Sequence, residues 1–274
     1  MRFNIGIRGH DLPNAPFLDV DDFIKTFKQY DLNYLQLVFN KAFVNFDFTK
    51  DNLITLAANL KNNDIKVAMI GAYFNMIHPN KDKLIKGINH FKECMKYAYL
   101  FDTKYVGSET GSLNGDKWIY VDGNHTSESF NKVKEVIKDL KNSNNQSYPL
   151  IEGAWNHVVY KPALLNELLN DLELDACTVD LYNYLNIDNY NDHLNIFKEC
   201  IALFGDKIKV LHIKDFIVED NKLVQVGIGK GLMNYEEIIP LIKKYLPNAI
   251  LILEGVKEPD IKSSIEYLRS YEDE

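Results

Sequence analysis

The sequence predicts an α/β protein with a single (β/α)8 fold, the TIM barrel, over residues 1–274. Short apolar strands alternate with amphipathic helices eight times along the chain. Four residues that end strands in the second half, Glu152, Asp180, His212 and Glu254, are spaced 28, 32 and 42 residues apart. These spacings are close to the ~30 residues or more that one βα unit needs. The length of 274 residues also suits a barrel, which typically takes about 250.

In the first half, strands and helices are recognised by their hydrophobic periodicity. Strands are expected at residues 3–8, 34–39, 65–70 and 104–107. Helices are expected at residues 19–30, 50–61, 81–100 and 127–141. In the first helix, Phe23 and Phe27 lie on one apolar stripe, and Asp19 is placed to cap its N-terminus. The long loop at residues 112–125 holds Trp118 and is either a functional lid or a surface decoration.

In the second half, each strand runs into a polar loop before the next helix. Strands are expected at residues 149–152, 175–180, 207–215 and 249–254. Pro162 and Pro259 mark two helix starts, since proline favours the first helical turn. Asn234 and Glu237 form a capping-box pattern, and Pro240 should lie in or just beyond the first turn of that helix, or kink it.

Composition excludes several classes of function. The net charge of -8 repels polyphosphate, so we expect no nucleic-acid partner. The three cysteines fit no metal motif and are interpreted as buried free thiols. The N-terminus lacks the apolar segment of a signal peptide, and no run is long enough to span a membrane. We therefore expect a cytoplasmic protein with no membrane contact.

One histidine and three carboxylates are predicted to converge at one end of the barrel. Glu152, Asp180, His212 and Glu254 each end one of four successive strands. In a barrel, these strand ends meet at the face that carries active sites. Carboxylates packed together repel one another unless something positive lies among them. The set therefore predicts one divalent cation, with Mn²⁺ as the first choice and Mg²⁺, Co²⁺ or Zn²⁺ as alternatives.

These motifs resemble the xylose isomerase-like superfamily, the sugar phosphate isomerase/epimerase group that includes ketose 3-epimerases. The resemblance covers essentially the whole chain. The motifs that carry it are Glu152, Asp180-Leu181-Tyr182-Asn183, His212-Ile213-Lys214-Asp215, Gly227-Ile228-Gly229 and Glu254. It implies that Glu152, Asp180, His212 and Glu254 bind one metal ion and that the two glutamates exchange a proton with the substrate.

The implied chemistry is proton transfer at a carbon next to a carbonyl. A bound cation would acidify that carbon and stabilise the enediolate, while a glutamate removes the proton. Return of the proton to the neighbouring carbon gives isomerisation, whereas return on the opposite face of the same carbon gives epimerisation. Two positions depart from the ketose 3-epimerase pattern, because Asn183 and Ile217 stand where those enzymes carry histidine and arginine.

Several further residues are candidates for binding a sugar or sugar phosphate. Lys214 and Asp215 follow the metal histidine, and Asn183 follows the metal aspartate. His157 and Glu109 come directly after strands, where either substrate contact or a structural hydrogen bond is expected. Arg8, Lys214 and Lys230 are the cations that we expect near the site.

The main alternative function is an inosose-type dehydratase, which uses the same proton abstraction but expels a hydroxide. Endonuclease IV-like DNA repair needs further histidines, and Asn183 replaces one of them. A non-catalytic sugar-binding barrel would not need two glutamates beside a metal. The resemblance also implies a homo-oligomer, either a dimer or a tetramer.

Overall fold

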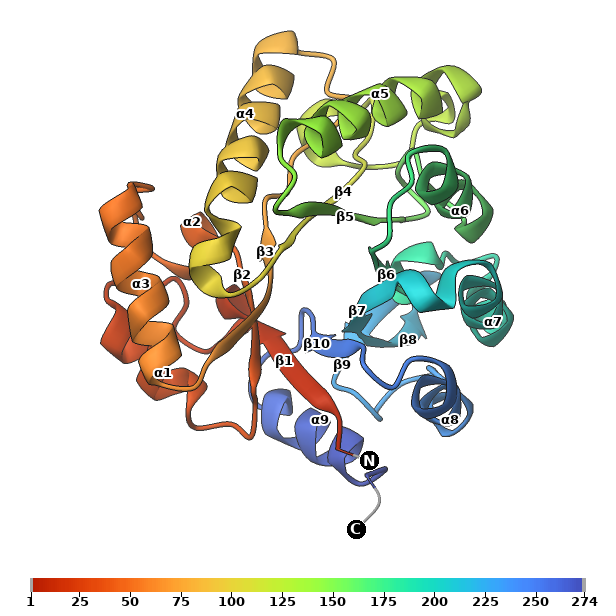
Figure 1. Ribbon diagram of the computed structural model, residues 1–274. Coiled ribbons are helices and arrows are strands. Elements are labelled where there is room, and N and C mark those ends of the chain that lie inside the picture. The colour runs from red at the N-terminus through yellow and green to blue at the C-terminus, as the bar shows by residue number, and fades with distance from the viewer. Residues whose placement is uncertain (1, 273–274) are drawn as a thin grey trace.

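Eight parallel strands close into a barrel in the computed structural model, which describes residues 2–272 (Figure 1). The barrel strands are β1 (Asn4–Arg8), β2 (Tyr34–Leu37), β3 (Lys66–Gly71), β4 (Tyr105–Glu109), β5 (Tyr148–Glu152), β6 (Cys177–Asp180), β7 (Ile208–Ile213) and β10 (Ile250–Leu253). Neighbours in the chain are neighbours in the sheet, and β10 pairs with β1 to close the ring. The predicted (β/α)8 barrel is confirmed.

Helices surround the ring of strands, as Figure 1 shows. They are α1 (Val20–Phe27), α3 (Lys50–Asn62), α4 (Lys81–Tyr97), α5 (Ser127–Ser143), α6 (Pro162–Asp171), α7 (His193–Phe204), α8 (Tyr235–Tyr245) and α9 (Asp260–Arg269), with one extra turn, α2 (Phe39–Ala42), after β2. The Asp19 carboxylate accepts a hydrogen bond from Asp22 N, and the Asn234 side chain accepts one from Glu237 N, so both expected caps are present. Pro240 lies inside α8, beyond its first turn.

The core has two parts, one between strands and helices and one inside the barrel. The inner part contains Met69, Leu150, Val210 and Ile252, all buried. Gly107 leaves space for the Met69 side chain, because a Cβ at position 107 would overlap the Met69 methyl group. All three cysteines are free and buried, as expected. Within the described residues, no helix is long and apolar enough to cross a membrane.

A β-hairpin after β7 departs from the predicted loop. We expected one strand over residues 207–215, but β7 ends at Ile213 and a new strand, β8 (Asp215–Glu219), pairs antiparallel with β9 (Lys222–Val226). The two turn residues, Asp220 and Asn221, have φ of 49° and 58°. Asp and Asn tolerate this left-handed conformation, which two-residue hairpin turns require. The alternating apolar residues on either side were the signal for this hairpin.

Candidate metal centre and active site

Strand register places the expected residues side by side on one rim of the barrel. Glu109 is the register partner of Glu152, and Asp180 is the partner of His212. His212 also pairs with Ile252, two residues before Glu254. Parallel strands in this register end at one level, so side chains at the ends of different strands converge there.

Three of the four expected metal ligands form a compact buried cluster. Potential ligand atoms of Glu152, Asp180 and His212 all lie within 4.8 Å of one another. The Nδ1 atom of His212 is 3.2 Å from Glu152 Oε2 and 3.9 Å from Asp180 Oδ2. Glu254 joins from β10, with Oε2 2.9 Å from the same Nδ1. An imidazole and three carboxylates are a donor set for a divalent cation.

Gln36 on β2 orients the histidine. His212 Nε2 lies 2.7 Å from Gln36 Oε1, and Gln36 Nε2 donates to the Tyr73 hydroxyl at 2.7 Å. Because an amide oxygen only accepts, Nε2 carries a proton, and Nδ1 is the ring nitrogen that faces the carboxylates and would bind a cation in place of a proton. Nδ1 is buried and makes no aligned hydrogen bond. This is the arrangement that metal-binding histidines adopt, with the other ring nitrogen held by a hydrogen bond. The residues therefore fit a divalent cation.

Two side-chain cations also lie among the carboxylates. Lys214 Nζ is 2.7 Å from Asp180 Oδ2 and 2.7 Å from Glu254 Oε1. Arg8 Nη1 is 2.9 Å from Glu254 Oε1. Repulsion among the carboxylates is therefore not sufficient evidence for a metal ion, because other positive charges are available to them. The orientation of His212 is the stronger evidence for a cation.

The electrostatics of the cluster follow from burial and these charges. Burial raises the pKa of Asp180 to about 6, although Lys214 lowers it in part. Burial would also raise the pKa of Glu254, but Lys214, His212 and Arg8 hold it well below its usual range. Burial alone would lower the pKa of His212, yet Glu254 and Glu152 raise it to about 10. In the metal-free protein, a proton on His212 supplies part of the positive charge.

Of the expected substrate-binding residues, Asn183 and Glu109 lie beside the cluster. Asn183 Nδ2 donates to Glu152 Oε1 at 2.7 Å, and its Oδ1 accepts from Lys214 Nζ at 3.0 Å. Glu109 lines the pocket with its side chain one-fifth exposed. Burial, Glu152 and Glu254 raise the pKa of Glu109 to about 8, so this acid is largely protonated at neutral pH.

His157 and Asp215 are both buried and contact other parts of the protein. His157 is buried, its ring packs against Trp118, and its Nδ1 lies 3.8 Å from Glu109 Oε1. Asp215 points into its own loop, where its fully buried carboxylate accepts four backbone hydrogen bonds. The donors are the N–H groups of Phe216, Gly229, Gly231 and Met233. These contacts differ from the expected substrate contact and give Asp215 the position of a loop anchor.

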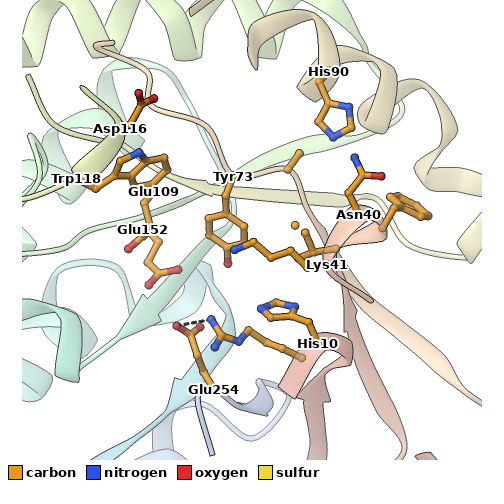
Figure 2. Close-up of a pocket in the computed structure, with 15 residues that line it drawn as sticks. His10, Asn40, Lys41, Tyr73, His90, Glu109, Asp116, Trp118, Glu152 and Glu254 are labelled. Atoms are coloured by element: carbon orange, nitrogen blue, oxygen red, sulfur yellow. Dashed lines mark ion pairs between the residues drawn. The ribbon is translucent and has the colours of Figure 1, made fainter. Parts of the chain in front are cut away.

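An open pocket of about 490 Å³ lies over the cluster, within the usual size range of small-molecule sites. Figure 2 shows Glu109 and Glu152 on one side, with Trp118 above them, and His10 and Lys41 on the other side. Trp118 comes from the 112–125 loop, so this loop contributes to the pocket wall. No sequence pattern had singled out Tyr73 or Lys41. A polar Gln36 inside a buried strand was a signal that we did not use.

A family model for the xylose isomerase-like TIM barrel matches residues 24–271. The chain belongs to this family. Among solved structures, a D-tagatose 3-epimerase-like protein superposes with a TM-score of 0.76 at 14% identity, covering 98% of this chain and 97% of the other.

Two further structures of this fold belong to proteins that are named for other reactions. The probable 3-DHS dehydratase AsbF from Bacillus anthracis gives a TM-score of 0.72 at 15% identity, covering 99% of this chain and 100% of that one. Endonuclease IV from Thermus thermophilus gives a TM-score of 0.72 at 14% identity, covering 97% of this chain and 98% of that one. At such low identity these similarities show the fold alone, so the function is argued from the site.

A partial sequence match involves a protein of another kind. The chain is 29% identical over 129 residues to the Holliday junction branch migration complex subunit RuvA of Mycoplasma mycoides subsp. mycoides. The match takes in 43% of this chain and 64% of that protein, less than two thirds of its length. No activity is transferred from it.

Proposed function

We propose that this protein is a divalent-metal-dependent isomerase or epimerase acting on a sugar or sugar phosphate. The observation that carries the proposal is the pair of glutamates beside an oriented histidine. Glu152 and Glu254 both approach His212 Nδ1, at 3.2 and 2.9 Å, from different strands. A cation site beside two acid–base groups suits proton transfer at carbon.

When bound, the cation would polarise the substrate carbonyl and so acidify the neighbouring C–H bond. The residues of this chain orient the two carboxylates and transfer the proton. Asn183 holds Glu152, and Lys214 with Arg8 holds Glu254, so each carboxylate is kept in one orientation. One glutamate removes the proton and the same or the other glutamate returns it. Trp118 covers the glutamate side of the pocket.

The test combines metal content with proton exchange. We expect one equivalent of a divalent ion in the native protein, lost in His212→Ala and retained in His125→Ala, whose histidine lies outside the cluster. The metal-loaded native protein should then incorporate solvent deuterium into a ketose or ketose phosphate. If neither the native protein nor His212→Ala binds Mn²⁺, Mg²⁺, Co²⁺ or Zn²⁺, the proposed mechanism is wrong and a non-catalytic sugar-binding barrel is favoured. Three equivalents of metal would favour the endonuclease.

A dehydratase is the second candidate, and Glu109 is the observation that favours it. Loss of hydroxide requires a proton donor at the leaving oxygen, and Glu109 is a pocket-lining acid whose pKa is raised to about 8. Mass spectrometry separates the two reactions, since dehydration removes one water from the substrate whereas isomerisation and epimerisation leave its mass unchanged.

A further inference from the structure

The cations that we expected to bind an anionic substrate are already neutralised. Lys214 is held by Asp180 and Glu254. Arg8 is held by Glu254 and, at 2.6 Å from its Nε, by Asp11. Lys230 pairs with Asp260 at 2.6 Å on the exposed surface. A negative group on a substrate needs a different partner.

Lys41 is a further cation of the pocket. It lies on α2, directly after β2, and lines the same pocket as the glutamates. In the part of the chain that the structure describes, no carboxylate oxygen lies within ion-pair distance of its ammonium group. Its Nζ lies 6.0 Å from the centre of the Tyr73 ring. An exposed lysine normally gains little from a surface ion pair, but one facing a bound ligand can make a charge-assisted hydrogen bond.

His10 and Asn40 also line the pocket, with Asn40 on the side of His90 and away from His10 (Figure 2). The His10 ring lines the pocket, and its Nδ1 is buried without a hydrogen-bond partner. Burial and the neighbouring Arg8 lower the pKa of His10 to about 4, with a smaller contribution from Lys41, so the ring is neutral and can donate a hydrogen bond. The nearby acids, Asp11 and Glu254, are both paired with Arg8.

The pocket therefore has two unlike ends. Figure 2 shows Glu109 and Glu152 at one end and His10 at the other, with the Lys41 side chain reaching from that end toward Tyr73 in the middle and Glu254 below, beside its partner Arg8. A neutral sugar would leave Lys41 without a counter-charge. A substrate with a hydroxyketone at one end and an anionic group at the other would satisfy both ends.

We propose that Lys41 and His10 form a subsite for the terminal oxyanion of the substrate, a phosphate ester or a carboxylate. This inference rests on the proposed function and narrows its substrate class to phosphorylated sugars or sugar acids. Lys41 supplies the charge, and the His10 side chain supplies a neutral donor. The anionic group is thereby kept away from Glu109 and Glu152, and the reacting carbons are directed toward them.

The subsite is tested by binding of compounds that cannot react. Sorbitol 6-phosphate and sorbitol have no carbonyl group, so their affinities for the metal-loaded protein, measured by calorimetry, do not depend on catalysis. We expect sorbitol 6-phosphate to bind about 10-fold or more tightly than sorbitol, as a charge-assisted contact predicts. Lys41→Gln should remove most of this preference and Lys41→Arg should restore part of it. Lys25→Gln, an exposed lysine on α1, should leave it unchanged.

Each outcome decides the inference. The inference is overturned if neither sorbitol 6-phosphate nor gluconate binds more tightly than sorbitol, or if the preference for the anion is undiminished in Lys41→Gln. Gluconate in place of sorbitol 6-phosphate shows whether the terminal carboxylate of a sugar acid is the better ligand, and a Lys41-dependent preference for either anion supports the subsite. Deuterium exchange tests the proposed function separately, so the subsite and the catalytic mechanism can fail independently.

Discussion

The two halves of the barrel contribute differently to the site. Strands β5, β6, β7 and β10 place Glu152, Asp180, His212 and Glu254 around one point. Strands β1 to β3 and the segments after them supply groups that orient or balance this cluster. The candidate metal ligands therefore all come from the second half, whereas the groups that orient or balance them come from both halves, because Asn183 and Lys214 belong to the second.

The groups of the first half act on the second by direct contact. Gln36 reaches the His212 ring, and Arg8 pairs with Glu254 across the closing edge between β1 and β10. Removing a partner of a metal ligand typically lowers metal affinity or activity by about 10–100-fold, whereas removing a general acid or base typically lowers the rate by about 10²–10⁴-fold. Substitutions in the two halves should therefore produce effects of different size and kind.

The largest effect is expected from removing either glutamate of the second half. Glu152→Gln and Glu254→Gln should each lower solvent deuterium exchange by about 10²–10⁴-fold, the usual contribution of general acid–base catalysis. Glu266→Gln, on the exposed face of α9, is the matched control and should exchange at the native rate. A variant of Glu152 or Glu254 with native exchange would remove that residue from the proposed mechanism.

A smaller effect is expected from the first half, at Gln36. Gln36→Met keeps the size of the side chain but loses the acceptor for His212 Nε2, so metal affinity should fall about 10–100-fold. A competing chelator dye measures this affinity. Tyr73→Phe leaves the hydrogen bond between Gln36 and His212 in place, so it should lower metal affinity less than Gln36→Met does. Native affinity in Gln36→Met would show that burial alone orients the histidine.

Asp215 tests whether a residue next to the cluster belongs to the scaffold. Asp215→Asn puts an NH₂ group where backbone N–H groups need acceptors, and it should lower the free energy of unfolding by about 1–3 kcal/mol in urea denaturation. Asp220→Asn, in the hairpin turn, should be nearly neutral because Asn tolerates the left-handed conformation there. Native stability together with weaker sugar binding in Asp215→Asn would restore the expected substrate contact.

The smallest effect is a pH dependence of stability that comes from Glu109. Its pKa is raised from 4.5 to about 8, so the folded protein holds this proton more tightly than the unfolded chain does. The resulting stabilisation is present below pH 4.5 and is lost as pH rises toward 8. In metal-free protein, Glu109→Gln should therefore lose less thermal stability between about pH 5 and pH 8 than the native chain. The effect is limited because the side chain is one-fifth exposed. An identical loss in both proteins would contradict it.

The barrel and the four candidate ligands could be predicted because both depend on local patterns. A short apolar strand followed by a polar residue is visible in the sequence, as in Val179 and Asp180. The parallel strands of a barrel all end on one face, so residues that end successive strands are expected to lie near one another. The hairpin of β8 and β9 was missed because its polar turn residues were interpreted as a loop.

The tertiary structure alone decided how these residues are held. His212 and Gln36 are 176 residues apart in the chain and meet only because the barrel closes. Lys214 follows His212 by two residues, yet its contacts with Asp180 and Glu254 depend on three strands together. Asp215, its neighbour, turns into the loop because four backbone N–H groups converge on it. Local pattern determines which residues reach the rim, whereas charge pairing across the barrel determines which of them remain available for a ligand.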